Sequence, residues 1–423
     1  MILIKNGRGI DPKSGTDEIL DLLIEDGKIA GIGKYKRSND YERVIEAEGK
    51  IVAPGLIDVH VHFRDPGLTY KEDIESGAKA AAAGGFTTVV CMANTKPPVD
   101  NPETLSYVLE KGKQTDIQVL SVAAVTKGMQ GKELTDFAEL KAAKAVGLSD
   151  DGIPIQDSRL MYEALKRAKE VGLAISLHEE DPAFVLQAGI NKGHVSKALG
   201  IGGAMALSEE LMVARDCTLA LETKARVSIQ HVSSRVSVEH IRLAQKLGAD
   251  VWAEATPQHF SLTEEDALVK KNFAKVNPPL RTEDDRRGII EGLKDGTIQI
   301  IATDHAPHSA EEKSREITKA PSGMIGLETA LALGITNLVR TGSLTMECFL
   351  KKMTFNPAKL YGLDSGYIAE GAQADLVIFD EFEKWKVEKF HSKSNNSPFI
   401  GEELYGKVKY TICKGRIVYE DKE

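Results

Sequence analysis

The central part of the chain alternates between two hydrophobic patterns. Short apolar runs such as TTVVC (87–91) and LAISL (173–177) are typical of buried strands. The segments between such runs, for example 158–171 and 235–247, carry apolar residues at the spacing of amphipathic helices. From about residue 51 to 365 we count eight strand–helix units. Units in this order require parallel strands with right-handed crossovers, and eight of them can close into a barrel.

Both ends of the chain have a different pattern. Residues 1–50 and 366–423 consist of short strand-like runs separated by turn residues, with no long helical period. We expect these two segments to pair into one small β domain, which brings the chain ends together. The sequence therefore predicts an α/β fold with a barrel over 53–365 and a β domain assembled from 1–52 and 366–423.

Net charge and apolar content narrow the possible partners. A chain of 423 residues with a formal charge of −9 has no positive field to attract nucleic acid or an anionic membrane surface. It contains no uncharged apolar stretch of membrane-spanning length. Its four cysteines lie far apart without a CxxC pair, which is typical of reduced thiols in the core of a cytosolic protein. We expect a soluble, cytoplasmic protein that acts on a small molecule.

Two histidines end the first strand of the predicted barrel. His60 and His62 are one residue apart, so both rings leave the same face of the strand and can meet one metal ion. Taken alone, this pair fits a metal site and a pair of surface histidines equally well. Further candidates follow other predicted strands: Asp150–Asp151, His178, His231 and Asp304. The carboxyl ends of barrel strands meet at one mouth, so the sequence predicts a shared metal site there. Of the two adjacent aspartates only one is expected to bind, and a turn is the alternative role for Asp150.

Several motifs, in one order along nearly the whole chain, resemble a known family. They are PGLIDVHVHFRDPG, MANTKPPVD, LSDDG, HEED, QHVSS, NPPLR, ATDHAPH and PSGMIGLET. The chain is similar to the dihydroorotases, of the longer type within the amidohydrolase superfamily. This resemblance implies a TIM-type (β/α)8 barrel, a β-sandwich formed from both termini, and a zinc site. It also implies the reversible cyclisation of N-carbamoyl-L-aspartate to L-dihydroorotate in de novo pyrimidine biosynthesis.

The resemblance also implies a set of metal ligands. One zinc ion would be held by His60, His62 and Asp304. A second would be held by His178 and His231, with Asp151 bridging the two ions. Many members of the superfamily have a carboxylated lysine at the bridging position, whereas LSDDG contains no lysine. An aspartate reaches less far, so the sequence is compatible with one or with two zinc ions per chain.

The remaining assignments concern catalysis and the substrate. Asp304 is expected to act as general acid and base for a hydroxide formed from zinc-bound water. Arg64 resembles the clamp for the substrate carboxylate, an anion that the planar guanidinium suits. The expected substrate contacts are His62, Arg64, Asn94, Asn277, His308, Ser322 and Gly323. The charged stretch 309–320 is expected to form a mobile loop over the site, with a non-catalytic insertion as the alternative.

Two other functions share these features. A hydantoinase, dihydropyrimidinase or allantoinase would have the same metal site, but Arg64, Asn94 and His308 favour a substrate with a free carboxylate. A weakly active or silent subunit that supports aspartate transcarbamoylase is the third hypothesis, and the complete ligand set argues against it. The resemblance also implies a complex with aspartate transcarbamoylase, and we expect a homo-oligomer.

Overall fold

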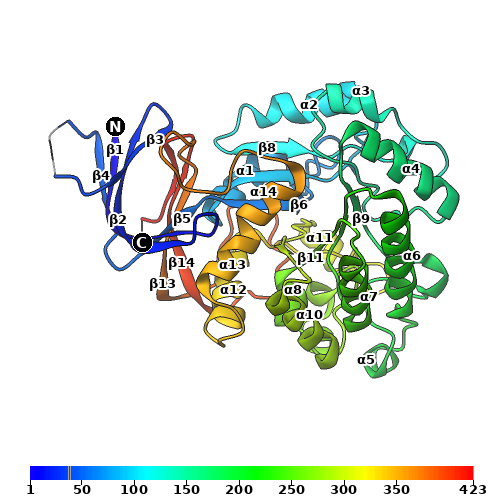
Figure 1. The fold of residues 1–423 in the computed structure, drawn as a ribbon. Coiled ribbons are helices and arrows are strands. Elements are labelled where there is room, and N and C mark those ends of the chain that lie inside the picture. The colour runs from blue at the N-terminus through cyan, green and yellow to red at the C-terminus, as the bar shows by residue number, and fades with distance from the viewer. Residues whose placement is uncertain (37, 39, 423) are drawn as a thin grey trace.

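The computed structural model describes residues 1–36, 38 and 40–422 of the chain. An α/β barrel makes up most of the molecule, and a smaller β sheet that contains strands from both ends of the chain lies against one side of it (Figure 1). The predicted fold class is confirmed.

Parallel strands form the wall of the barrel. The strands of more than one residue are β6 (Leu56–Val61), β7 (Phe86–Cys91), β8 (Gln118–Ser121), β9 (Ile175–Leu177), β10 (Val227–Ile229), β11 (Val251–Ala255) and β12 (Ile300–Ile301). Leu148 takes the place of the remaining strand, with parallel bridges to Ala123 and Ile175. A parallel bridge between Val61 and His305 closes the ring. The fourth of the eight predicted strands is therefore reduced to one bridging residue.

Helices cover the outside of the barrel. They are α1 (Ile74–Ala83), α2 (Pro102–Gly112), α3 (Phe137–Ala142), α4 (Ser158–Val171), α6 (Leu207–Thr223), α7 (Arg235–Lys246), α10 (Glu283–Asp295), α13 (Met346–Met353) and α14 (Phe355–Tyr361), with shorter α5 (His194–Ala198), α8 (Pro257–Ser261), α9 (Asp266–Lys270), α11 (Ala310–Lys313) and α12 (Ala330–Gly334) between them. The prediction for 158–171 is confirmed, because Asp157 caps the start of α4 and Gly172, at φ 68°, ends it. The helix of the third strand–helix unit is short, because Asp136 caps α3 and so sets its start.

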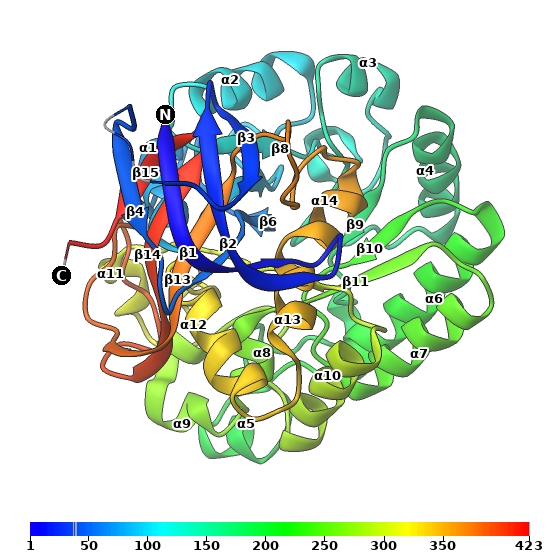
Figure 2. The ribbon, with the colours of Figure 1, turned by 60° about the vertical axis from the view of Figure 1, so that its left-hand side comes forward.

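The two ends of the chain form one hydrogen-bonded sheet (Figure 2). Its strands are β1 (Ile2–Asp11), β2 (Thr16–Glu25), β3 (Lys28–Gly33), β4 (Arg43–Glu46), β5 (Ile51–Pro54), β13 (Leu376–Lys386), β14 (Glu403–Cys413) and β15 (Arg416–Glu420). Antiparallel pairing of β5 with β13 joins the two ends. Its own apolar core includes Ile4, Leu22 and Ile378. The exact division into 1–52, 53–365 and 366–423 stays a prediction, and the sheet itself extends to Pro54.

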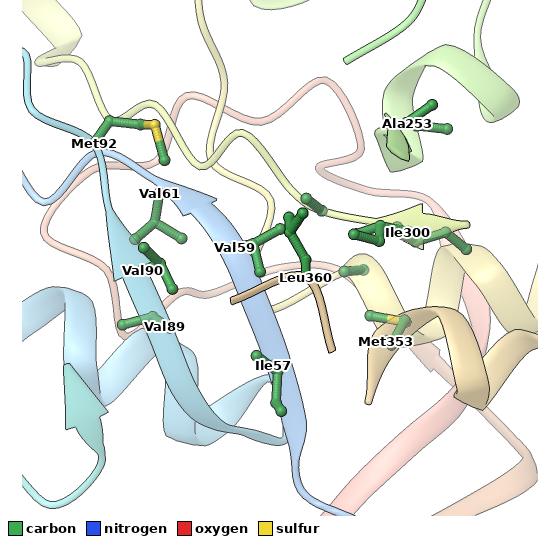
Figure 3. Packing of buried hydrophobic residues seen from close by; sticks show 14 of the residues in the cluster. Ile57, Val59, Val61, Val89, Val90, Met92, Ala253, Ile300, Met353 and Leu360 are labelled. Atoms are coloured by element: carbon green, nitrogen blue, oxygen red, sulfur yellow. The ribbon is translucent and has the colours of Figure 1, made fainter. Parts of the chain in front are cut away.

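The packing of β6 determines which of its side chains reach the barrel mouth. Ile57, Val59 and Val61 lie in an apolar cluster with residues of β7, α13 and α14 (Figure 3). Because side chains alternate along a strand, His60 and His62 share the opposite face. The apolar cluster thus fixes the direction of both imidazoles.

Two further expectations concern the rest of the chain. None of the helices in the described part of the chain combines the length and the apolar character that crossing a membrane requires.

Cys91, Cys217 and Cys413 are buried as expected, but Cys348 is exposed. The expectation of a core position is wrong for Cys348 because α13 buries Phe349, Leu350 and Met353 instead.

Candidate metal centre and substrate pocket

The six residues expected as metal ligands converge at one end of the barrel. They are His60 and His62 with β6, Asp151 after the bridging Leu148, His178 after β9, His231 after β10 and Asp304 after β12. All six side chains are buried. Long-range closure of the barrel brings together residues that are more than half the chain apart, such as His60 and Asp304.

A first group forms around the two histidines of β6. Nε2 of His60 lies 3.5 Å from Oδ1 of Asp151 and 3.5 Å from Oδ1 of Asp304. Nε2 of His62 lies 2.9 Å from Oδ1 of Asp304 and 3.4 Å from Oδ2 of Asp151. One ligand atom from each of His60, His62 and Asp151 lies within 4.8 Å of the others. This spacing suits a single ion, because zinc–ligand distances are about 2 Å.

A second group consists of Asp151, His178 and His231. Oδ1 of Asp151 lies 3.6 Å from Nδ1 of His178 and 3.7 Å from Nε2 of His231. The ligand atoms of this group also lie within 4.8 Å of one another. Asp151 is therefore shared, and its carboxylate stands between two sets of imidazole nitrogens.

The chemistry of these groups fits a metal cation. Nε2 of His60 is buried and has no hydrogen-bond partner among the described residues. Burial alone lowers the pKa of His60, but the carboxylates of Asp151 and Asp304 outweigh burial and raise that pKa well above its usual value. Burial alone raises the pKa of Asp151, but the histidines, His60 foremost, bring it well below its usual value. Nitrogen and carboxylate donors in surroundings that favour added positive charge suit zinc and similar divalent ions.

Two acidic residues that were not predicted from the sequence contact these histidines. Oε2 of Glu254, on β11, lies 3.2 Å from Nδ1 of His60. Oε2 of Glu180 lies 3.3 Å from Nε2 of His178. Carboxylates in such positions fix the tautomer and orientation of an imidazole ligand. Both had a sequence signal, since Glu254 interrupts the apolar strand VWAEA and Glu180 belongs to the HEED motif.

Asp150 has a structural role in a loop. Its Oδ1 accepts hydrogen bonds from the backbone N–H groups of Val125, at 2.7 Å, and Thr126, at 3.1 Å. Of the two adjacent aspartates, Asp151 is the one that faces the histidines. The structure thus decides between the two candidates that the sequence offered.

A cavity of about 210 Å³ lies next to the two groups. It is lined by His62, Arg64, Asn94, Asp151, Gly152, His178, His231, Asn277, Asp304, Ala306, His308, Ser322 and Gly323. This set includes every expected substrate contact, and adds Gly152 and Ala306, which were not expected. The structure brings the expected residues together, while their roles stay predictions.

Arg64 brings a positive charge to this cavity. Its Nε donates to the carbonyl of Pro307 at 3.3 Å, and its Nη2 lies 3.5 Å from Nε2 of His308. No carboxylate forms an ion pair with its guanidinium in the part of the chain that the structure describes. Burial lowers the pKa of Arg64. Arg64 also has φ of 60°, a conformation that non-glycine residues rarely adopt and that is found most often at functional sites.

Asn94 is hydrogen-bonded to two of the expected metal ligands. Its Oδ1 lies 2.9 Å from Nδ1 of His62, and its Nδ2 donates to Oδ2 of Asp151 at 3.1 Å. Oδ1 of Asn277 is buried without a hydrogen-bond partner among the described residues. An unused acceptor at the cavity wall is available to a ligand.

His308 is held in one tautomer by its neighbours. Its Nδ1 accepts from Nζ of Lys71 at 3.3 Å, because an ammonium group can only donate. Its Nε2 therefore carries the hydrogen and donates to the carbonyl of Ser322 at 2.8 Å. Lys71 was not predicted from the sequence.

The stretch 309–320 contains more structure than the sequence predicted. Its first turn is α11, closed by a capping box between Ser309 and Glu312. Lys313 is buried, and its Nζ donates to the carbonyls of Pro321 at 3.0 Å and Gly323 at 2.8 Å. A lysine that bonds to carbonyls can be buried despite its charge, and Lys313 thereby attaches this stretch to Gly323 of the cavity wall. The expected mobility of the stretch stays a prediction. Closure of this stretch over the site stays a prediction.

Comparison with known proteins supports one family. Residues 51–418 match the amidohydrolase family, so the chain belongs to that family. The chain is 62% identical over 419 residues to the dihydroorotase of Clostridioides difficile, covering 99% of this chain and all of that protein. It is 56% identical over 424 residues to the dihydroorotase of Clostridium acetobutylicum, covering all of both. Within the amidohydrolases the chain groups with the dihydroorotases.

Solved structures with the same fold include a hydantoinase and a dihydropyrimidinase. The L-hydantoinase of Arthrobacter aurescens has a TM-score of 0.88 at 28% identity, covering all of this chain and 96% of that one. The dihydropyrimidinase of Brevibacillus agri has a TM-score of 0.85 at 25% identity, covering all of this chain and 95% of that one. These similarities agree with the barrel and sheet described above.

Proposed function

We propose that the chain is a metal-dependent dihydroorotase, which interconverts N-carbamoyl-L-aspartate and L-dihydroorotate. The observation that carries this proposal is Arg64, whose guanidinium lines the cavity without an ion-pair partner among the described residues. The ring of dihydroorotate bears a carboxylate that can pair with this group. A neutral cyclic amide would leave the charge uncompensated, which is unfavourable in a partly buried site. The names of the relatives at 62% and 56% identity agree with this proposal.

The residues that would hold the metal are those of the two groups. His60, His62 and Asp304 would bind one zinc ion, His178 and His231 a second, and Asp151 both. The shared position of Asp151 supports two ions rather than one. Bound zinc polarises an amide carbonyl and lowers the pKa of water from about 15.7 to about 7.

Asp304 is placed to move the proton during ring opening. Burial alone raises its pKa, but His60 and then His62 outweigh burial and keep the carboxylate ionised. A water oxygen forms a bond to the ring carbonyl carbon while Asp304 accepts a proton from that water. Asp304 then passes this proton to the ring nitrogen as the carbon–nitrogen bond breaks. The other water proton is released when the new carboxyl group ionises, and ring closure reverses these steps.

Recognition of the ring would be shared among the other lining residues. Arg64, with Asn94 and His308 beside it, would bind the ring carboxylate. Asn277 would accept a hydrogen bond from the ring edge through its unpaired Oδ1. The Ser322–Gly323 backbone would contact the same ring. Contacts on several sides would hold the scissile amide in the geometry for attack.

A substrate comparison tests the proposal. The purified chain is assayed for ring opening of L-dihydroorotate, dihydrouracil and hydantoin, and zinc is determined on the same sample. We expect zinc-dependent activity that favours dihydroorotate over the two uncharged rings. Higher activity on an uncharged ring would instead support a hydantoinase or dihydropyrimidinase, the second candidate that the structural neighbours favour.

Three further proposals concern the cellular location and the assembly of the protein. We propose a cytoplasmic location, a homo-oligomeric state, and a complex with aspartate transcarbamoylase that acts on the 309–320 stretch. Size-exclusion chromatography with light scattering, alone and with aspartate transcarbamoylase, tests the assembly. Activity that is unchanged by that partner would contradict an effect on the 309–320 stretch.

A further inference from the structure

A segment of the C-terminal part of the chain runs across the barrel mouth. Residues 391–396 lie between β13 and β14 and alternate in burial, with Ser392, Ser394 and Asn396 buried. The hydroxyl of Ser394 donates to the carbonyl of Lys71 at 2.7 Å. The backbone N–H of Lys393 donates to Oε1 of Glu72 at 3.1 Å. These bonds attach the segment to the loop that follows β6.

Asn396 attaches the same segment to the cavity wall. Its Oδ1 accepts from the backbone N–H of His308 at 3.1 Å. Its Nδ2 donates to the carbonyls of Ala306 at 3.0 Å and Gly323 at 3.1 Å. Its own carbonyl accepts from the N–H of Ile325 at 3.1 Å. One buried amide therefore holds two stretches of backbone, at 306–308 and at 323, which lie 73 to 90 residues before it along the chain.

The three residues that the side chain of Asn396 holds all line the cavity. Ala306, His308 and Gly323 belong to its wall. Nε2 of His308 also donates to the carbonyl of Ser322, so the two stretches are tied to each other as well as to Asn396. Asn396 does not itself line the cavity. Its influence on a ligand would pass through the position of this wall.

We propose that Asn396 is a positioning residue, which sets the affinity of the site for the ring carboxylate by fixing the wall that carries His308 and Gly323. This inference rests on the proposed function. The part of the chain that forms the small sheet would thus also complete the substrate pocket in the barrel. A displacement of about 1 Å in such a wall is enough to change rates about a hundredfold. None of the expected metal ligands is hydrogen-bonded to Asn396 among the described residues, so the metal centre should be unaffected.

Two substitutions and two matched controls test this role. Asn396→Asp keeps the shape and the acceptor for His308 but loses both donor bonds, and Asn396→Leu removes all three side-chain bonds. The neighbouring Asn395 is exposed, so Asn395→Asp and Asn395→Leu change the same residue type without touching the wall. Each variant is assayed for kcat and KM with L-dihydroorotate, for its affinity in a metal-loaded binding titration, for zinc content and for Tm.

We expect KM and the dissociation constant of dihydroorotate to rise about tenfold or more in the Asn396 variants, with a smaller change in kcat and full zinc content. The Asn395 variants should match the wild type. If Asn396→Asp folds and its KM and dissociation constant stay within about twofold of the wild type, Asn396 has only a structural role and the inference is overturned. A lower Tm with unchanged affinity leads to the same conclusion. If the wild-type chain itself neither binds nor opens dihydroorotate, the proposed function fails first, and this inference with it.

Discussion

Replacing Arg64 by methionine probes the feature that separates a dihydroorotase from enzymes for uncharged rings. Methionine retains an unbranched side chain of similar reach but removes the charge and the donors. Among the described residues, the guanidinium of Arg64 has two polar contacts, a carbonyl at 3.3 Å and an imidazole at 3.5 Å. The substrate carboxylate would therefore be its ionic partner.

The size of the effect follows from the loss of one partner of a hydrogen-bonded ion pair. Such a loss costs about 2–5 kcal/mol, and the partial exposure of Arg64 favours the lower end. At about 1.4 kcal/mol for each factor of ten, kcat/KM for dihydroorotate should fall roughly 30- to 5000-fold. Activity on dihydrouracil should not fall, because that ring carries no carboxylate. The Tm should not fall either, since replacing an uncompensated, partly buried charge by an apolar group is rarely destabilising.

Initial rates of ring opening on both substrates give the answer. Arg64→Lys serves as a graded variant that keeps the charge without the planar fork, and Arg315→Met serves as a control because Arg315 is exposed and pairs with Glu311. Zinc content is measured on every sample. A loss of less than about threefold on dihydroorotate, or an equal loss on both rings, would refute the reasoning that Arg64 pairs with the carboxylate.

Three other changes give separate tests. Asp304→Asn should retain most of its zinc but lose turnover by about 10²–10⁴-fold, because the amide cannot carry the proton; rates within tenfold of wild type would exclude the proton transfer. Glu254→Gln should weaken metal affinity about 10- to 100-fold in a chelator competition, because the carboxylate 3.2 Å from His60 orients that ligand, and an unchanged affinity would contradict this role. Burial lowers the pKa of Lys352 from 10.5 to about 8, so its folded state binds fewer protons than the unfolded state between these values, and stability should rise with pH across about 8 to 10.5. Lys352→Met should reduce that rise and increase the stability at pH 7 by about 2 kcal/mol, whereas the exposed neighbour Lys351→Met should do neither in thermal denaturation from pH 7 to 10.5.

Local sequence patterns predict most of the expected metal ligands, but not all of them. The alternation of β6 already places His60 and His62 on one face, and the strand ends already mark His178, His231 and Asp304. Those are short-range properties, since the direction of a side chain depends on its own strand and on the apolar residues beside it. The pattern could not decide between the two adjacent aspartates. That choice depends on Val125 and Thr126, whose N–H groups bind Asp150 and leave Asp151 to the histidines.

The sequence by itself determined the order of strands and helices and the strand-end positions of the reactive residues. The tertiary structure alone decided the distances between ligands, the pairing of Glu254 with His60 and the contact of Asn396 with the cavity wall. Periodicity and motifs report the neighbourhood of each residue along the chain. Barrel closure and the return of residues 391–396 to the mouth join segments that are far apart in sequence, and only packing in three dimensions determines which of them meet.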